Sequence, residues 1–342
     1  MHAPADLYGR PHADRLMRAL VPVVAGYQRL SRLSARNQPA VAPVGRDLIL
    51  DVLAVEDAAE GVVALRLADV QGRPLPRWRP GGHLDVILPS GRRRQYSLCG
   101  DPMDRMTYRI AVRLVSDTGG SGELHALTAG GTLTVRGPRN AFPFVDRGPY
   151  LFVAGGIGIT PILPMVRMAA RRGADWRLVY TGRSRASMPF LDELAALPTT
   201  DRVRVLAAET VPDIADLLAD APSGASLYCC GPTPMIDAVR REWTGPLHFE
   251  RFSPPPVVDG KPFELQLGAG GPVVPVAADE SALEALRRAR PGSAYSCRQG
   301  FCGTCRVGVL AGAVDHQGAA VSDGSMLVCV SRAVDERVVL DV

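Results

Sequence analysis

Three cysteines in the segment YSCRQGFCGTC, residues 295–305, stand at a spacing that suits a metal cluster. They follow the pattern C-x4-C-x2-C, and Cys329 comes 23 residues after the last of them. This is the ligand spacing of plant-type [2Fe-2S] clusters, in which one loop supplies three thiolates and the fourth comes from elsewhere in the fold. The alternative is structural zinc, but zinc ligands usually come as two short pairs, and Cys329 has no neighbouring Cys or His. The pattern therefore favours a [2Fe-2S] cluster, which carries one electron.

Seven cysteines in 342 residues also bear on where the protein works. An odd number in so long a chain argues against a secreted disulfide scaffold, and thiolates used as ligands indicate a reducing compartment, so we expect a cytoplasmic protein. Cys99 and Cys229 are expected to be small buried residues. No apolar run approaches the roughly 18–20 residues of a membrane-spanning helix, and charged residues interrupt the N-terminal segment too often for a secretory signal.

The segment RRRQYSLCG, residues 92–100, carries side-chain types that could hold a flavin. Arg94 could pair with a phosphate, the face of Tyr96 could stack on a flat ring, and Ser97 could hydrogen-bond a ring nitrogen. Further on, Gly-Gly-Ser at 119–121 stands just before an expected short helix, whose N-terminus would be a phosphate site. Taken alone, the first segment could equally be an exposed basic strand.

Two glycine-rich turns follow expected strands. VAGGIGITP, residues 153–161, joins a strand to a helix, and YCCGPTPM, residues 228–235, repeats the arrangement at a later strand end. The first lacks the third glycine of the G-x-G-x-x-G fingerprint, but its glycines still admit a pyrophosphate. Because ligands of open parallel sheets bind outside the carboxyl ends of strands, the two loops together predict a nucleotide site, although either alone could be an ordinary turn.

The pattern of elements changes along the chain. Short alternating segments from Asp47 onward, with Gly and Pro between them, predict an antiparallel barrel. From Tyr150, apolar strands alternate with helical stretches, which predicts a parallel sheet. A proline-rich linker then precedes two expected strands and a helix ahead of the cysteine loop. A formal charge of only +4, with no basic run interleaved with aromatic residues, argues against nucleic acid as a partner.

These changes predict domain boundaries. The first 45 residues are expected to form a helical arm or a frayed tail, with a partner-docking or membrane-surface helix as the alternative. We expect an N-terminal extension (1–45), a flavin-binding β-barrel (46–145), an NAD(P)-binding α/β domain (146–250), a linker (251–262) and a [2Fe-2S] ferredoxin domain (263–342).

In this order the motifs resemble those of the phthalate dioxygenase reductase family, within the ferredoxin–NADP reductase superfamily. The matching text spans about residues 46–342 and consists of RQYSL, GGS, GGIGITP, CGP, HFERF and CRQGFCGTC…C. The resemblance implies a multidomain fold: an antiparallel β-barrel flavin domain, an α/β parallel-sheet nucleotide domain and a C-terminal α+β plant-type ferredoxin domain of the β-grasp type. It also implies FMN, a [2Fe-2S] cluster and NADH as cofactors.

The resemblance also implies site residues by position. The cluster ligands would be Cys297, Cys302, Cys305 and Cys329. The flavin and its phosphate would be held by Arg94, Gln95, Tyr96, Ser97, Leu98, Ala111, Val112, Gly119, Gly120 and Ser121. The nicotinamide site would be lined by Gly156, Thr160, Cys230, Gly231 and Pro232, with Phe249 and Glu250 near the ring. We expect no catalytic acid or base, because the cofactors carry the chemistry.

The residues leave the choice of nucleotide open. Arg183 and Arg185 follow the expected strand end in YTGRSR, where they could bind the 2′-phosphate of NADPH. The alternative is a solvated basic turn, and the resemblance favours NADH.

The function that the resemblance implies is electron transfer. NAD(P)H would reduce the flavin by hydride transfer, and single electrons would then pass through the cluster to a separate terminal oxygenase, either Rieske-type or a cytochrome P450. The alternative from another class is a non-enzymatic iron–sulfur redox sensor or a zinc-stapled scaffold. The intact RQYSL, GGS and GGIGITP segments favour the enzyme.

Overall fold

The computed structural model describes residues 20, 22–24, 26 and 47–342, except 118, 146–147, 211, 253–256, 258, 296–297, 301–302, 318, 320 and 323. The chain divides into two units, Met1–Arg46 and Asp47–Val342. The predicted helical arm within 1–45 falls almost wholly outside the described residues, and so do the predicted ligands Cys297 and Cys302. The second unit contains an antiparallel barrel, a parallel sheet and a small C-terminal mixed sheet.

The first part of this unit is the predicted antiparallel barrel. Its strands are β1 (Asp47–Ala59), β2 (Val62–Asp69), β3 (Gly82–Ile87), β4 (Arg93–Ser97), β5 (Thr107–Arg113) and β6 (Thr132–Asn140). They pair in the order β4-β3-β6-β1-β2-β5. A bridge between Leu98 and Ile110, with a 2.8 Å bond from the Cys99 amide to the Arg109 carbonyl, joins the two outer strands and closes the barrel. Alternate residues such as Leu65 point inward and fill the interior.

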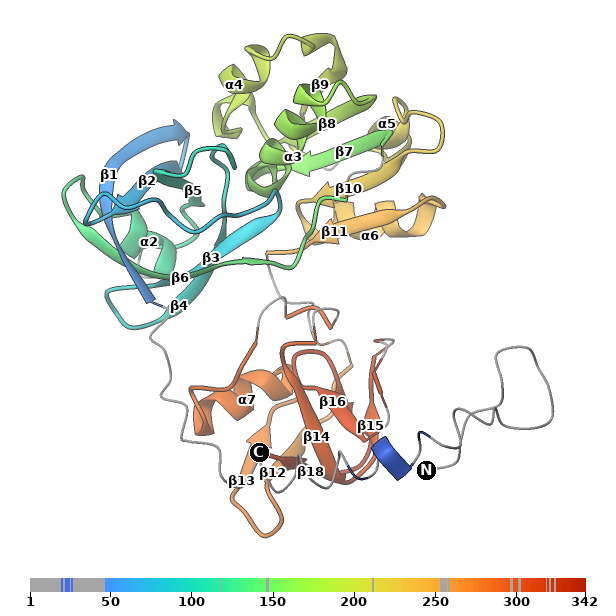
Figure 1. Cartoon of the computed structure of the whole chain (residues 1–342). Helices are drawn as coiled ribbons and strands as arrows, with labels where there is room; N and C mark the ends of the chain where they lie inside the picture. Colours follow the sequence, from blue (N-terminus) through green and yellow to red (C-terminus); the bar gives the residue numbers. More distant parts are fainter. Residues whose placement is uncertain are drawn as a thin grey trace. The chain divides into compact units, whose positions relative to one another are not determined.

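The next part is the predicted parallel α/β sheet (Figure 1). Its strands are β7 (Tyr150–Gly155), β8 (Trp176–Gly182), β9 (Val203–Ala207), β10 (Ser226–Cys230) and β11 (Leu247–Glu250), in the order β11-β10-β7-β8-β9. Its helices are α3 (Ile159–Arg171), α4 (Leu191–Ala195), α5 (Ile214–Leu218) and α6 (Thr233–Glu242), with short 3-10 turns η1 (Gly156–Gly158), η2 (Arg185–Ser187) and η3 (Thr200–Arg202).

Alternation along the strands assigns the helices to two faces of this sheet. Tyr150 and Phe152 belong to one core cluster with α3 and α4, whereas Leu151 and Val153 belong to another with α5 and α6. The chain runs outward from β7 through β8 to β9 and then returns to β10 beside β7. This reversal places a ligand crevice at the carboxyl ends of β7 and β10. The glycine-rich turns follow these two strands.

The C-terminal part is a small mixed sheet covered by a helix. Its strands are β12 (Phe263–Leu267), β13 (Val273–Val276), β14 (Arg306–Ala311), β15 (Val314–Asp315), β16 (Ser325–Leu327), β17 (Arg332–Ala333) and β18 (Arg337–Asp341). The main sheet has the order β13-β12-β18-β14-β16, with β12 and β18 parallel. Helix α7 (Ala282–Ala289) begins at a Ser281–Glu284 capping box and buries Leu283 and Leu286 against the sheet.

The predicted fold class is therefore confirmed, with small differences in the elements. The helix α2 (Gly120–His125) begins at Gly120, so Gly120 and Ser121 lie in its first turn rather than before it. Helix α5 and strand β11 were not predicted as elements. The helix is only about one turn long and the strand has four residues, so neither shows a clear hydrophobic period. The domain boundaries stay a prediction. Among the residues that the structure describes, no helix is long and apolar enough to cross a membrane.

Candidate functional site

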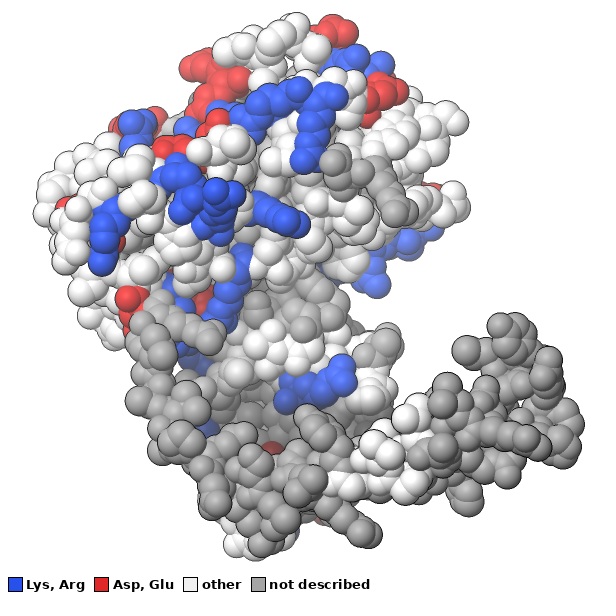
Figure 2. Space-filling view, viewed as in Figure 1, with Lys and Arg blue, Asp and Glu red and all other residues white. Residues whose placement is uncertain are grey.

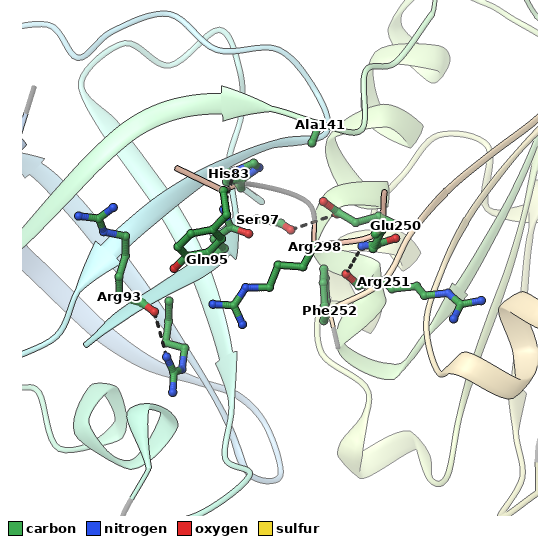
Figure 3. Close-up of a pocket in the computed structure, with 12 residues that line it drawn as sticks. His83, Arg93, Gln95, Ser97, Ala141, Glu250, Arg251, Phe252 and Arg298 are labelled. Carbon is green, nitrogen blue, oxygen red and sulfur yellow. Dashed lines mark hydrogen bonds between the residues drawn. The ribbon is translucent and has the colours of Figure 1, made fainter. Parts of the chain in front are cut away.

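One cavity brings together the barrel, the end of the α/β domain and the cysteine loop. Its volume is about 120 Å³. Barrel strands β3 and β4 form one wall, and the chain that follows β11 forms another (Figure 3). The lining residues are His83, Arg93, Arg94, Gln95, Ser97, Ala141, Glu250, Arg251, Phe252, Tyr295, Arg298 and Gln299.

The charge of this cavity suits an anionic cofactor. Four arginines line it, at positions 93, 94, 251 and 298, against a single carboxyl group, Glu250. Two of its polar atoms, the Tyr295 hydroxyl and Arg251 Nε, are buried with no hydrogen-bond partner among the described residues. Because buried polar groups in proteins are nearly always hydrogen-bonded, these atoms fit a bound polar group. The cavity therefore fits a phosphate-bearing flavin.

Glu250 is the buried acid of the cavity. It lies at the end of β11, and the Ser97 hydroxyl donates a 3.5 Å hydrogen bond to its Oε2. Burial raises the pKa of its carboxyl to about 8, so the group is mostly protonated and uncharged at neutral pH. Cys230, on the neighbouring strand β10, is in register with Glu250. Burial and the nearby Glu250 carboxyl raise the pKa of the Cys230 thiol well above its usual value.

The predicted flavin residues of β4, and Leu98 directly after it, do not all reach the cavity. Arg94, Gln95 and Ser97 line the cavity, and Gln95 donates a 3.0 Å hydrogen bond to Asp85. Tyr96 and Leu98 pack on the hydrophobic core of the barrel. The structure therefore brings three of the five side chains to the cavity.

The predicted phosphate residues lie beside Arg94. A Cβ on Gly120 would stand 2.6 Å from Leu88 Cδ1 and 3.3 Å from Arg94 Cγ, so a larger residue here would have to displace these side chains. Gly119 is the N-cap residue of α2. The Ser121 hydroxyl holds its own loop, since it accepts from the Val115 amide at 3.1 Å and donates to the Ser116 carbonyl at 3.2 Å.

Ala111 and Val112 lie on β5 with buried side chains. Ala111 belongs to the core shared with the α/β domain, and Val112 belongs to the barrel core. Any contact with a flavin would have to come from their backbone, because neither side chain lines the cavity.

A second cavity lies at the carboxyl ends of the parallel strands. It is lined by both glycine-rich turns and by the chain after β8 and β9, and it includes the predicted residues Gly156, Arg183, Gly231 and Pro232. A Cβ on Gly158 would meet the Cys230 carbonyl oxygen at 2.2 Å, so the two turns touch only because glycine stands there. This cavity fits a dinucleotide.

Four of the residues predicted for the nicotinamide site do not line this cavity, and one of them, Glu250, lines the first cavity instead. Thr160 is buried and donates a 3.0 Å bond to the Ile157 carbonyl, which holds the turn, and Cys230 is buried behind it. Phe249 packs against Arg240, whose guanidinium lies 5.1 Å from the ring centre.

The outer end of the second cavity carries charges of both signs. Arg183 follows β8 and Glu209 follows β9, and both line the cavity. A 2.9 Å bond from the Ala208 amide to the Gly182 carbonyl holds the two strand ends together. Figure 2 shows Lys and Arg side chains gathered in patches on the face drawn.

The two described cysteine ligands lie in one small region of the C-terminal domain. Cys305 precedes β14 and Cys329 follows β16, and these strands pair. Both side chains are buried. Gly300 has a φ of +83°, which favours glycine, and a Cβ there would meet Val330 at 2.8 Å. This tight loop with buried thiols fits an iron–sulfur cluster.

The sequence reasoning missed several lining residues. Phe249 was predicted to lie near the nicotinamide ring, but the aromatic residue that lines both cavities is Phe252, whose side chain is 48% exposed. The period of two along an extended chain places residue 252 on the side of Glu250, and this signal could have identified it. Glu209 and Arg298 carried no local signal.

Two family descriptions match the chain. A 2Fe-2S iron-sulfur cluster binding domain matches residues 269–334, and an oxidoreductase NAD-binding domain matches residues 152–241. The first match favours a cluster over structural zinc at the cysteine loop.

Whole proteins match as well. The phthalate dioxygenase reductase of Burkholderia cepacia is 35% identical over 312 residues, which cover 86% of this chain and 97% of that protein. A solved phthalate dioxygenase reductase structure, described as modular for electron transfer from pyridine nucleotides to [2Fe-2S], is 34% identical with a TM-score of 0.67 and covers 86% of this chain and 98% of its own. An intact type IV self-sufficient cytochrome P450 monooxygenase is 37% identical with a TM-score of 0.68, over 92% of this chain and 44% of its own.

Proposed function

The chain belongs to the phthalate dioxygenase reductase family, and on that premise we propose that it passes electrons from NADH through FMN and a [2Fe-2S] cluster to a terminal oxygenase. It is the reductase component of a multicomponent oxygenase, an oxidoreductase with a 2Fe-2S domain and an NAD-binding domain. The observation that carries the proposal is the shared cavity, in which Ser97, Glu250 and Arg298 come from the three parts of the relay.

The cofactors supply the electron chemistry. When bound, FMN would supply two-electron acceptance from the nicotinamide and one-electron release, and the cluster would supply one-electron transfer. The chain's residues bind and orient these groups. Arg94 and Gly120 would hold the flavin phosphate, and Gln95 and Ser97 would contact the ring.

Protonated Glu250 holds its proton in the cavity, where it would be able to donate a hydrogen bond to a bound flavin. Because this carboxyl group is mostly uncharged at neutral pH, it adds little negative charge to a site that receives electrons. Phe252 lies between the two cavities and shields the flavin from water until the nicotinamide enters.

The nucleotide enters the second cavity with its pyrophosphate on the Gly156 turn. Glu209 accepts hydrogen bonds from the adenosine ribose of NADH and disfavours the 2′-phosphate of NADPH, whereas Arg183 favours it. We expect NADH to be the preferred donor, and Arg183 leaves NADPH as a weaker one.

The cluster is held by Cys297, Cys302, Cys305 and Cys329. The terminal partner is a Rieske-type oxygenase, and a cytochrome P450 is the second candidate, since the self-sufficient P450 monooxygenase contains a segment that resembles this chain. We also propose a cytoplasmic location, because cysteines used as cluster ligands suit a reducing compartment.

The experiment compares the native protein with Arg94→Gln. Flavin is released by denaturation and identified by chromatography, and NADH-driven reduction of ferricyanide is measured on the purified protein. We expect FMN, with activity, and an Arg94→Gln variant that binds FMN about tenfold more weakly after losing a charge-assisted bond. Arg92→Gln is the matched control, because its side chain does not line the cavity. A native protein without flavin, or without activity, would contradict the proposal.

A further inference from the structure

Arg298 belongs to the cysteine loop but lies in the flavin cavity. It immediately follows the predicted ligand Cys297, and its guanidinium stacks on the Tyr295 ring at 4.5 Å from the centre. Figure 3 shows its side chain reaching into the cavity beside the residues of β4. The cluster-binding loop thus extends a positive charge into the flavin site.

Arg298 also lines a second, small cavity, and Cys329 lines it too. One side chain therefore borders both the flavin cavity and the space next to a cluster ligand. Cys329 is buried, and Arg298 is in the lining of its small cavity as well as of the flavin cavity.

The backbone around Arg298 is held in an unusual way. Its φ is +55°, a left-handed conformation that few residues other than glycine, Asn and Asp adopt readily. The next residue, Gln299, donates a 2.7 Å hydrogen bond to the Arg251 carbonyl, directly after Glu250. Strained residues of this kind persist where the surroundings determine them, often at functional sites.

We propose that Arg298 is a positioning residue that places a fixed cation between the flavin and the cluster and makes the flavin easier to reduce. The proposal rests on the proposed function, since it requires a flavin in this cavity. Reduction adds negative charge to a flavin, and a nearby cation in a partly buried site favours the more negative form. Because the cation belongs to the cysteine loop, the same contact holds that loop against the flavin.

Arg287 provides a matched control. Its guanidinium stacks on the same Tyr295 ring at 4.4 Å, and it lines the small cavity with Cys329, but it does not line the flavin cavity. Loss of its charge should therefore affect the cluster much as loss of Arg298 does, while the flavin stays as it was.

The experiment measures the ratio of the dissociation constants of oxidised and reduced FMN, with the cluster in place, in Arg298→Gln, Arg298→Lys and Arg287→Gln. The flavin midpoint potential reports the same ratio, and electron paramagnetic resonance checks the reduced cluster. We expect Arg298→Gln to lower the preference for reduced FMN about tenfold and to make the flavin potential more negative. Arg298→Lys should recover most of the preference, and Arg287→Gln should match the native protein.

Two results would overturn the inference. One is a preference for reduced FMN in Arg298→Gln that stays within about twofold of the native value, and the other is a change in Arg287→Gln as large as that in Arg298→Gln. A tenfold change corresponds to about 1.4 kcal/mol. If Arg298→Gln loses its cluster, Arg298→Asn removes the same charge with a residue that tolerates the left-handed backbone, and the same limits apply to it. A native protein that binds no flavin would refute the proposed function instead, so the two failures are distinguishable.

Discussion

Replacing Glu250 with glutamine removes a titrating group from the flavin cavity while it keeps the shape of the side chain. The native carboxyl group is buried and accepts a hydrogen bond from the Ser97 hydroxyl. Burial raises its pKa to about 8 from the ordinary value of 4.5. The folded protein therefore binds this proton more tightly than the unfolded chain does.

The sign and size of the effect follow from that difference. A raised folded-state pKa gives a stabilising contribution that is complete below pH 4.5 and is lost as the pH rises through about 8. At 1.36 kcal/mol for each pH unit, the loss amounts to about 5 kcal/mol. Glutamine does not titrate, so Glu250→Gln should match the native protein at pH 4.5 and become progressively more stable than it up to pH 9.

Thermal unfolding of both proteins, measured at intervals from pH 4.5 to 9, tests this reasoning. At roughly 2–4 °C per kcal/mol, the melting temperature of the variant should exceed the native value by about 10 °C or more at the alkaline end. The difference between the two proteins cancels the titration of all other groups. A difference that does not change with pH would refute the claim that Glu250 is protonated in its buried site.

Three further predictions concern the α/β domain. Gly158→Ala should destabilise the protein by about 1–3 kcal/mol in chemical unfolding, because the new methyl group has no room; unchanged stability would show that the two turns separate easily. Glu209→Gln should raise the ratio of kcat/KM for NADPH to kcat/KM for NADH, and Arg183→Gln should lower this ratio. The same ratio in the native protein and both variants would place the adenosine ribose elsewhere. Glu193→Gln removes the anion that pairs with Arg109 at 2.6 Å and should lower stability by about 1–2 kcal/mol, a reduced value because both side chains are partly exposed; an unchanged melting temperature would contradict it.

The fold could be predicted from local patterns because each part has its own period. Alternation in segments such as TYRIAVR indicated the barrel strands, and strands alternating with helices indicated the parallel sheet. Short elements escaped: β11 has only four residues, and HFE alone does not distinguish a strand from a loop.

The site was predicted less completely, for physical reasons. Motif residues such as Ser97 and Gly156 lie at strand ends beside a cavity, as their motifs predicted. Phe249 was preferred to Phe252 because the motif was treated as a block, without the alternation that turns successive side chains to opposite sides. Arg298 could not be predicted as part of the flavin site, because the cavity wall it forms comes from distant segments.

An anaerobic titration of the purified protein with NADH, followed by its absorption spectrum, tests the central claim most directly. Flavin accepts two electrons and a [2Fe-2S] cluster accepts one, so the overlapping bands should bleach completely after about 1.5 equivalents of NADH. Bleaching of only the flavin band would break the proposed link to the cluster. A spectrum that neither NADH nor NADPH changes would contradict the account as a whole.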